Sequence, residues 1–166
     1  MSLRIAAALS ALFLCAPTFG ADLSVACKPV LASMEKTIAI DHATTTTAGT
    51  ETVKGVTVGG SMYFQSRGTW RKSPMTAQAA IAQSRENLKN AKEYSCTPLP
   101  DSVVDGVAVA NFATHMVSDD ATNDGAVAID TRSGLAIRVE NNLKTGAANA
   151  PHYVTQYTYG GIKAPM

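Results

Sequence analysis

After Cys96 the chain repeats one pattern, in which a run of Val, Ala, Thr and Ile residues is followed by a short turn built on glycine. β-Branched residues between turn signals favour strands, and Asp-Gly pairs favour hairpins. The second half of the chain is therefore predicted to form four or five antiparallel strands joined by short turns. The predicted turns are Asp105-Gly106, Asn123-Asp124-Gly125, Ser133-Gly134 and Thr145-Gly146.

Two earlier segments have the period of a helix. Apolar residues recur at spacings of three and four between Ser24 and about Lys36, with Pro29 in the first turn. Residues 37–58 are rich in Thr and Val and predict strands, and residues 74–93 predict a second helix capped by Ser73 or Thr76. The order of helix, strands, helix and strands predicts the α+β class. The apolar arc of the second helix consists of Ala77, Ala80, Ile81, Ser84, Leu88 and Ala91.

The first twenty residues have the pattern of a secretory signal peptide. Arg4 is followed by an apolar run from Ile5 to Ala16 and then by small residues, which predicts cleavage near Gly20/Ala21. Cys15 is assigned to the removed segment, because a lipoprotein signal needs a small residue before its cysteine and Leu14 stands there. Residues 21–166 are expected to form one periplasmic or secreted domain. No transmembrane segment is expected after processing, because no later run is apolar enough.

Removal of the signal peptide leaves two cysteines, Cys27 and Cys96. In an oxidising compartment two cysteines favour a structural disulfide. The competing interpretation is metal or redox chemistry, but the chain has no C-x-x-C motif and no histidine at ligand spacing from either cysteine. A Cys27–Cys96 disulfide is therefore predicted.

Charge is unevenly placed along the chain. Residues 54–92 contain seven Lys or Arg and one Glu, a net charge of +6, whereas residues 93–130 contain seven Asp or Glu and no Lys or Arg, a net charge of −7. Either the two blocks face each other after folding, or the basic block forms a patch for an anionic partner. Arg85, Lys89 and Lys92 are the predicted surface interaction residues for an acidic envelope partner. Alternatively, their stems cover the edge of the core while their charges stay in water.

No motif indicates a reaction, a metal or a cofactor. Asp120, Thr122 and Asp124 have the spacing of a calcium loop, but Thr131 occupies the twelfth position, where a bidentate Glu is needed. His42, His115 and His152 are far apart and have no metal-binding neighbourhood. G-x-S-x-G, Walker and dinucleotide-binding motifs are absent from the sequence. We expect no catalytic residues, no metal, no cofactor and no nucleic-acid partner.

The segment MYFQSRGTWRKSPM, residues 62–75, predicts a hairpin. A three-residue loop at residues 66–68, with Gly68 in the left-handed conformation, places Phe64 opposite Trp70. The aromatic pair then lies on one sheet face, where it contributes to a core or lines a cavity. Tyr63 would lie opposite Arg71, close enough for a cation–π contact. The predicted ligand-binding residues are Phe64, Trp70, Ile81 and Leu88.

Several segments together resemble a group of small exported proteins of Gram-negative bacteria. They are MYFQSRGTWRKSP, SRENLKNAKEYSC, DGVAVANFATH, IDTRSGLAIRVENN and HYVTQYTYGGIKAP. The strand, TRSGL turn and tyrosine-rich last strand also resemble the half-barrel of periplasmic lipoprotein carriers and related lipid-binding proteins. That resemblance implies a curved antiparallel sheet packed against two helices, with an apolar concave face that holds acyl chains and no catalytic residues. The chain departs from the carrier pattern in its Cys27–Cys96 bridge.

These observations leave two functional hypotheses. The first is a non-enzymatic exported protein that binds a lipid or other hydrophobic ligand between sheet and helices. The second is an envelope interaction or structural domain with a filled core, which uses the basic segment 67–92 against an acidic partner. A third possibility, an envelope hydrolase, would need a polar cluster that the sequence does not reveal. The first two differ in whether the space between helices and sheet is open or packed.

Overall fold

The computed structural model describes residues 25–145 and 148–165. A short 3-10 turn, η1 (Val25–Cys27), leads into α1 (Lys28–Ala39), and a second helix, α2 (Ala77–Lys89), follows the fourth strand. The strands are β1 (His42–Ala48), β2 (Glu51–Val58), β3 (Ser61–Ser66), β4 (Thr69–Thr76), β5 (Glu93–Val104), β6 (Val107–Val117), β7 (Ala121–Asp130), β8 (Ala136–Thr145) and β9 (Ala148–Tyr159).

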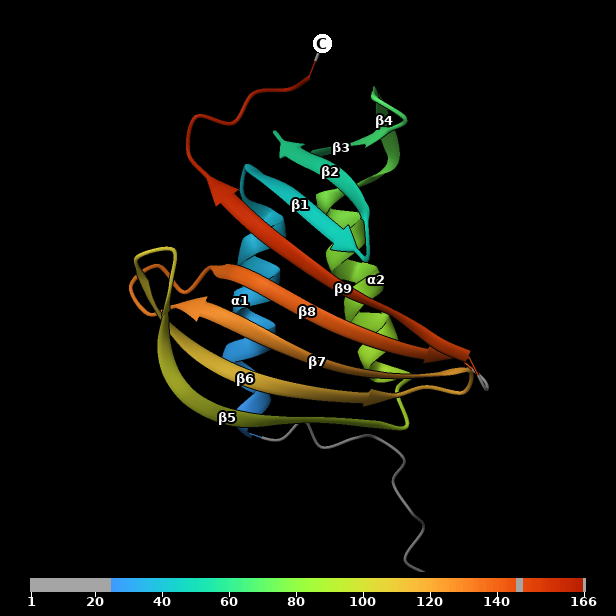
Figure 1. The fold of residues 1–166 in the computed structure, drawn as a ribbon, viewed down its shortest axis with the longest axis vertical. Coiled ribbons are helices and arrows are strands. Elements are labelled where there is room, and N and C mark those ends of the chain that lie inside the picture. Colours follow the sequence, from blue (N-terminus) through green and yellow to red (C-terminus); the bar gives the residue numbers. More distant parts are fainter. Residues whose placement is uncertain (1–24, 146–147, 166) are drawn as a thin grey trace, which may run out of the picture.

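The strands form one antiparallel sheet in the order β4-β3-β2-β1-β9-β8-β7-β6-β5. The two edge strands, β4 and β5, are consecutive in the chain and are connected by α2. Because a connection between opposite edges has to cross a face of the sheet, α2 lies over one face, and α1 lies on the same side (Figure 1). The sheet curves but does not close. The predicted α+β fold, a curved antiparallel sheet packed against two helices, is therefore confirmed.

Strand register shows which side chains face the helices. On β6 and β7, Phe112 lies opposite Val127, and Val127 lies opposite Val139 of β8, so these three share one face. That helix-covered face is called the concave face below. The buried core joins it to the start of α1 and contains Cys27, Val30, Cys96, Val127, Ile129, Ala136 and Val139. The core therefore lies between α1 and strands β5–β8. Strands β2–β4 and helix α2 contribute little to it.

The two helices begin in different ways, and among the described residues only α2 has a side-chain cap. Pro29 occupies the first turn of α1, where a backbone N–H has no helical partner. The hydroxyl of Thr76 accepts a hydrogen bond from the N–H of Ala79 at 3.2 Å, so the second of the two predicted caps is correct. The predicted start of α2 at residue 74 was too early, because Pro74 belongs to β4.

Of two predicted turns, the structure contains the one at residues 105–106 and not the one at residues 123–125. Asp105 and Gly106 have φ values of 49° and 80°, as a two-residue hairpin requires. The predicted turn at residues 123–125 is wrong, since these residues lie within β7 and the turn begins at Ser118, whose N–H donates to the carbonyl of Ala121. Gly125 serves close packing instead of a turn, because an added Cβ would lie 2.6 Å from the carbonyl oxygen of Glu140.

The predicted register of the β3–β4 hairpin is also wrong. Arg67 and Gly68, with φ values of 50° and 80°, form a two-residue loop in place of the predicted three-residue one. Phe64 therefore lies opposite Arg71, and Trp70 lies opposite Gln65. Since a one-residue change of register moves a side chain to the other face, Phe64 and Trp70 lie on opposite faces of the hairpin. Tyr63 lies opposite Lys72 and not opposite Arg71.

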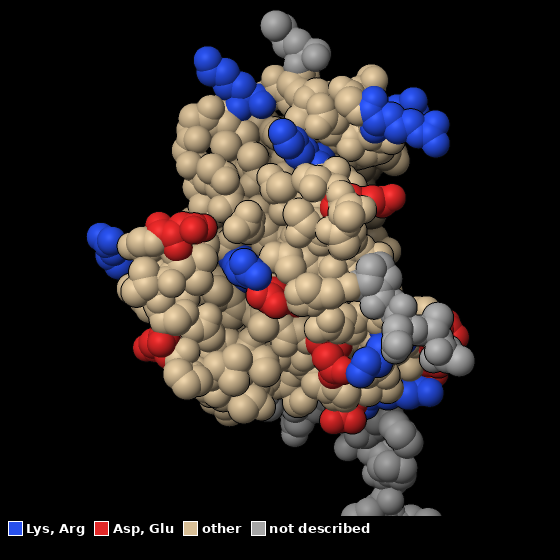
Figure 2. All heavy atoms as spheres, viewed as in Figure 1, with Lys and Arg blue, Asp and Glu red and all other residues tan. Residues whose placement is uncertain are grey.

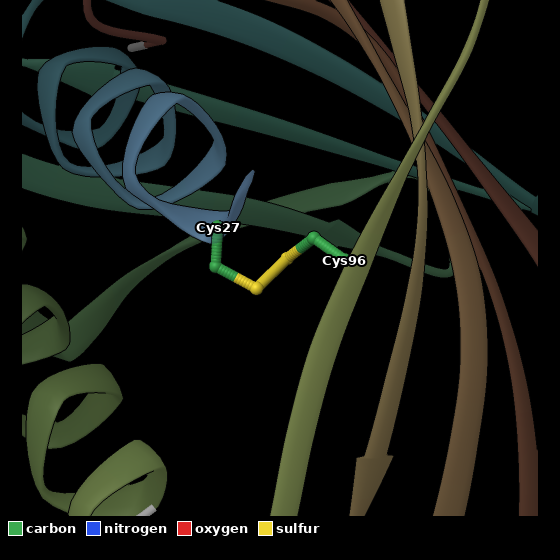
Figure 3. Close-up of a disulfide and its surroundings, with 2 residues drawn as sticks. All are labelled: Cys27 and Cys96. Atoms are coloured by element: carbon green, nitrogen blue, oxygen red, sulfur yellow. A yellow bond between two sulfur atoms is a disulfide. The ribbon is translucent and has the colours of Figure 1, made fainter. Parts of the chain in front are cut away.

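The disulfide joins Cys27 to Cys96, with 5.1 Å between their Cα atoms (Figure 3). It connects the start of α1 to the edge strand β5. Cys96 lies opposite Thr114, which places it on the concave face. The bridge therefore holds α1 against the sheet at the edge where the helix enters the fold.

The predicted signal peptide, including Cys15 and the cleavage site near Gly20/Ala21, lies outside the described residues. Gly146 of the predicted turn with Thr145 also lies outside them. Within the described residues, neither helix has the length and apolar character needed to cross a bilayer.

Candidate functional site

The space between the helix pair and the sheet is only partly filled. Its first opening, the β2 cavity, has a volume of about 300 Å³ and lies between the end of α1, the start of α2 and strands β1–β3 and β9. Ile38 of α1 and Ala80 of α2 form its helical wall. Its sheet wall contains His42, Thr44, Thr46, Gly55, Val56, Thr57, Met62, Tyr63, Thr155 and Tyr157.

A second opening, the Leu88 cavity, has a volume of about 240 Å³ and lies between the start of α1 and the end of α2. Its apolar wall consists of Val30, Leu31, Met34, Leu88, Met116, Val127 and Val139, with the ring of Tyr94. Its polar wall consists of Ser84, Asn87, Thr114, Asn123 and Asn141. The two cavities thus follow one another along the helix pair on the same face of the sheet.

Neither cavity is lined by Asp, Glu, Lys or Arg. Several polar groups in the walls bond to each other, as the hydroxyls of Thr46 and Thr155 do at 2.9 Å. Asn123 donates to the side-chain oxygen of Asn141 at 2.9 Å, while its own side-chain oxygen has no partner among the described residues. Apart from the imidazole of His42, the walls therefore present apolar surface and neutral dipoles, which suit an uncharged molecule.

One tyrosine in each cavity is partly removed from water. Burial raises the pKa of Tyr94 in the Leu88 cavity. Burial, with a smaller contribution from neighbouring Tyr159, raises the pKa of Tyr157 in the β2 cavity to about 12. Loss of water disfavours the charged phenolate, which is why burial shifts both pKa values upward.

The cavities exist because α2 is held mainly by other elements and not by the sheet beneath it. Ala77 is the one buried residue in this helix. Its N–H donates to the carbonyl of Gly60 at 2.9 Å, which fixes the start of the helix. Further along, the guanidinium of Arg85 makes two hydrogen bonds to Glu35 of α1, at 2.6 and 2.7 Å. The alanine-rich arc between these attachments is too small to fill the space above the sheet.

The four predicted ligand-binding residues lie in different places. Leu88 lines the cavity named after it. Ile81 is half-buried on α2 and does not line either cavity. Phe64 shares the concave face but is 39% exposed, and Trp70 lies on the other face of its hairpin. The structure therefore does not bring these four side chains together, and ligand binding by each of them stays a prediction.

The three predicted surface interaction residues each lie beside a carboxylate. Arg85 pairs with Glu35, and Lys89 lies 4.0 Å from Glu86. Lys92 pairs with Asp119 at 2.7 Å, which joins the basic sequence block to the acidic one. The hydrogen bonds of this pair raise the pKa of Lys92 and lower the pKa of Asp119. The interpretation that the blocks face each other is thus supported at this contact, and binding of an acidic partner by these residues stays a prediction.

The opposite, convex face carries a polar cluster that sequence reasoning missed. The Nδ1 atom of His115, on β6, lies 2.7 Å from the Oδ1 atom of Asp124. Ser95 lies directly opposite His115 on the neighbouring strand β5. Lys144 also bonds Asp124, and these two partners lower the pKa of the carboxyl group. Among the described residues no hydrogen bond joins Ser95, on the edge strand β5, to His115.

Most cavity-lining residues on the sheet were not identified from sequence. Tyr94, Met116 and Tyr157 each lie in a strand whose side chains alternate between the two faces of the sheet. This alternation is the one sequence signal that could have identified them. It separates two faces without saying which of them the helices cover. No group of His, Cys, Asp and Glu among the described residues has the arrangement of a metal site.

Comparisons with known proteins found distant likenesses among solved structures. No family model and no curated protein matches it. Lipoprotein LppX of Mycobacterium tuberculosis has a TM-score of 0.43 and 9% identity, over 82% of this chain and 96% of that chain. LprF from Mycobacterium bovis has a TM-score of 0.46 and 9% identity, over 82% and 92%.

A domain from Vibrio parahaemolyticus, described as outer membrane lipoprotein-sorting, has a TM-score of 0.27 and 10% identity, over 83% of this chain and 93% of that chain. Likenesses this distant carry no functional information about the chain.

Proposed function

We propose that this protein is a non-enzymatic binding protein that holds a neutral hydrophobic molecule between its helix pair and the concave face of its sheet. One observation carries the proposal: two half-open spaces of about 300 and 240 Å³, lined mostly by apolar and neutral polar side chains, follow one another between the helix pair and the sheet. Concave, mostly apolar spaces of this kind favour a binding role over a purely structural one.

The sizes of the cavities favour a slender ligand. Pockets for drug-sized molecules have volumes of roughly 300 to 1,000 Å³, and each cavity lies at or below the lower limit. A single hydrocarbon chain that follows the helix pair fits this space better than a lipid with several chains. The uncharged walls indicate that any polar group of the ligand inside the cavities is neutral.

The disulfide supports a location outside the cytoplasm. Cys27 and Cys96 are bridged within a small domain, as is usual in oxidising compartments and rare in the cytosol. With the signal-peptide pattern of the sequence, this favours a periplasmic or secreted protein. We infer that the ligand is one found in or outside the cell envelope.

Binding can be tested with an uncharged fluorescent probe, N-phenyl-1-naphthylamine, whose emission rises in apolar surroundings. We expect the protein to bind it and a competing long-chain alcohol to displace it. Ala80→Phe in the β2 cavity and Ser84→Phe in the Leu88 cavity should each weaken binding, because the new ring occupies the space. A loss of about tenfold corresponds to roughly 1.4 kcal/mol of binding free energy.

Matched controls come from the same helix. Ala79→Phe and Gln83→Phe introduce the same ring at exposed positions that do not line either cavity, so they should bind the probe as the native protein does. Equal binding by all four variants, or no binding by the native protein, would contradict the proposal. Solvent extraction of purified protein followed by mass spectrometry would identify a ligand retained from the cell.

A further inference from the structure

The β3–β4 hairpin, residues 61–76, is called the basic hairpin below. It carries Arg67 at its turn and Arg71 and Lys72 on β4, and Lys54 lies on neighbouring β2. All four side chains belong to exposed residues. No Asp or Glu occurs in the sequence from Thr52 to Ser84. Figure 2 shows Lys and Arg gathered over the end of the molecule that β3 and β4 form.

These four cations differ from the others of the basic sequence block. Arg85, Lys89 and Lys92 each have a carboxylate within 4.0 Å. Within the described residues, Lys54, Arg67, Arg71 and Lys72 have no carboxylate within that distance. Their charge is therefore not neutralised by the protein itself, and it is concentrated at one end of the sheet.

Apolar side chains are exposed among these cations. Phe64, directly opposite Arg71, is 39% exposed, and Val53 of β2 is 48% exposed. Met75, close to the base of the hairpin, is 37% exposed. Trp70 is half-buried and lies on the other face with Lys72 and Tyr63. Aromatic and basic side chains thus occur together on both faces of a short hairpin.

We propose that the basic hairpin docks this protein onto an anionic lipid surface. Lys and Arg are attracted to anionic headgroups, while aromatic rings prefer the boundary between headgroups and acyl chains. A soluble polyanion would satisfy the cations but would leave Phe64 and Val53 in water, which is why the membrane fits better. A hairpin with cations at its turn and on both faces suits an end-on approach to a charged plane.

Docking in this orientation brings the β2 cavity to the membrane, because β2 and β3 also supply Gly55 and Met62 of the concave face to its wall. The inference goes beyond the proposed function and does not depend on it, since an empty protein would dock equally well. If both hold, a hydrocarbon chain has a short path between bilayer and cavity.

The test is co-sedimentation of the full chain with vesicles of phosphatidylcholine, and with vesicles that also contain phosphatidylglycerol. We expect binding to the anionic vesicles only, with a shift of Trp70 emission to shorter wavelength. The variant Arg67→Glu/Arg71→Glu/Lys72→Glu should lose binding by more than about tenfold, because each cation near an anionic surface contributes roughly a fivefold factor. Binding should also weaken as salt is added.

The control Lys28→Glu/Lys89→Glu/Arg132→Glu changes the net charge equally, at exposed positions outside the basic hairpin. It should keep most of the binding. A milder variant, Lys54→Ala/Arg67→Ala, leaves β3 and β4 unchanged, so a weaker but clear loss there would show that misfolding does not explain the result.

If the two triple variants lose vesicle binding equally, net charge alone explains the binding and the proposal is overturned. Absence of vesicle binding, or equally tight binding to soluble polyglutamate without a change in Trp70 emission, would also overturn it. The hairpin variant should still bind the fluorescent probe, and Ala80→Phe should still bind vesicles. Failure of docking and failure of ligand binding are therefore distinguishable.

Discussion

Trp70 lies opposite Gln65 because the loop before it contains two residues, Arg67 and Gly68, with positive φ at both. A loop one residue longer would have paired Trp70 with Phe64 and made both part of one aromatic surface. With the observed loop, Phe64 shares the concave face with Met62, whereas Trp70 lies on the convex face with Tyr63. Its fluorescence is therefore suited to report membrane contact by the hairpin and is poorly placed to report ligand in the cavities.

The half-buried Tyr157 predicts a loss of stability at alkaline pH. Its folded-state pKa is about 12, whereas an unfolded tyrosine titrates near pH 10. As the pH rises from about 10 to 12, the unfolded chain releases this proton and the folded protein keeps it, so unfolding becomes easier by about 2 to 3 kcal/mol. Urea unfolding at several pH values would measure this decrease, and Tyr157→Phe should remove that part of it. Parallel curves for the two proteins from pH 9 to 12 would contradict the prediction.

The two helices are attached in different ways. α1 is fixed at its start by the disulfide and near its end by Thr37, whose hydroxyl accepts a hydrogen bond from the N–H of Ala136 at 2.9 Å. α2 is attached through Ala77 at its start and through Arg85 to α1. We expect α1 to behave as part of the core and α2 as the element that moves when the cavities fill.

Thr37→Val tests the attachment of α1 to the sheet. Thr37 is fully buried, so valine keeps the shape but leaves the N–H of Ala136 without its acceptor. An unsatisfied buried donor costs about 1 to 3 kcal/mol, and we expect the free energy of unfolding to fall by that amount. Thr37→Ser keeps the hydroxyl and should lose clearly less. If the valine variant is as stable as the native protein, this hydrogen bond does not hold the helix.

At the scale of the whole molecule, β1 and β9 join two halves of the sheet that are built differently. The half from β5 to β9 packs under α1 and contains the core and the disulfide. The half from β1 to β4 contains the β2 cavity and the basic hairpin. The core cluster and the disulfide are thus in one half, and the surfaces proposed for membrane docking and for part of the ligand are in the other.

Reduction of the disulfide should destabilise the entire fold. Cys27 and Cys96 are separated by 69 positions, and the chain-entropy model gives a loop of this length a stabilisation of about 4 kcal/mol. That is a large part of the stability of a typical domain. We expect the urea midpoint to fall on addition of reductant, and Cys27→Ser/Cys96→Ser to show the lower midpoint with no further response. A native midpoint that does not change with reductant would contradict the bridge as a stabilising element.

Local patterns in the sequence were sufficient for the class of fold, the two helices and the pair of cysteines. The period of Val30, Leu31 and Met34, the threonine-rich strands and turns such as Asp105-Gly106 depend on neighbouring residues, so they can be read without the rest of the chain. Where two local signals competed, the prediction was less accurate. Gly125 was assigned to a turn, although it is needed where strands β6 to β8 pack closely.

The candidate site depended on contacts between distant segments. The crossing of α2 between the two edge strands places the helices over one face of the sheet. That placement decides whether Tyr94, Tyr157 and Asn123 line a cavity. Which cations stay unpaired follows from the approach of Glu35 to Arg85 and of Asp119 to Lys92. Packing and ion pairing act through space between residues far apart in the chain, so periodicity and spacing along the chain do not predict them.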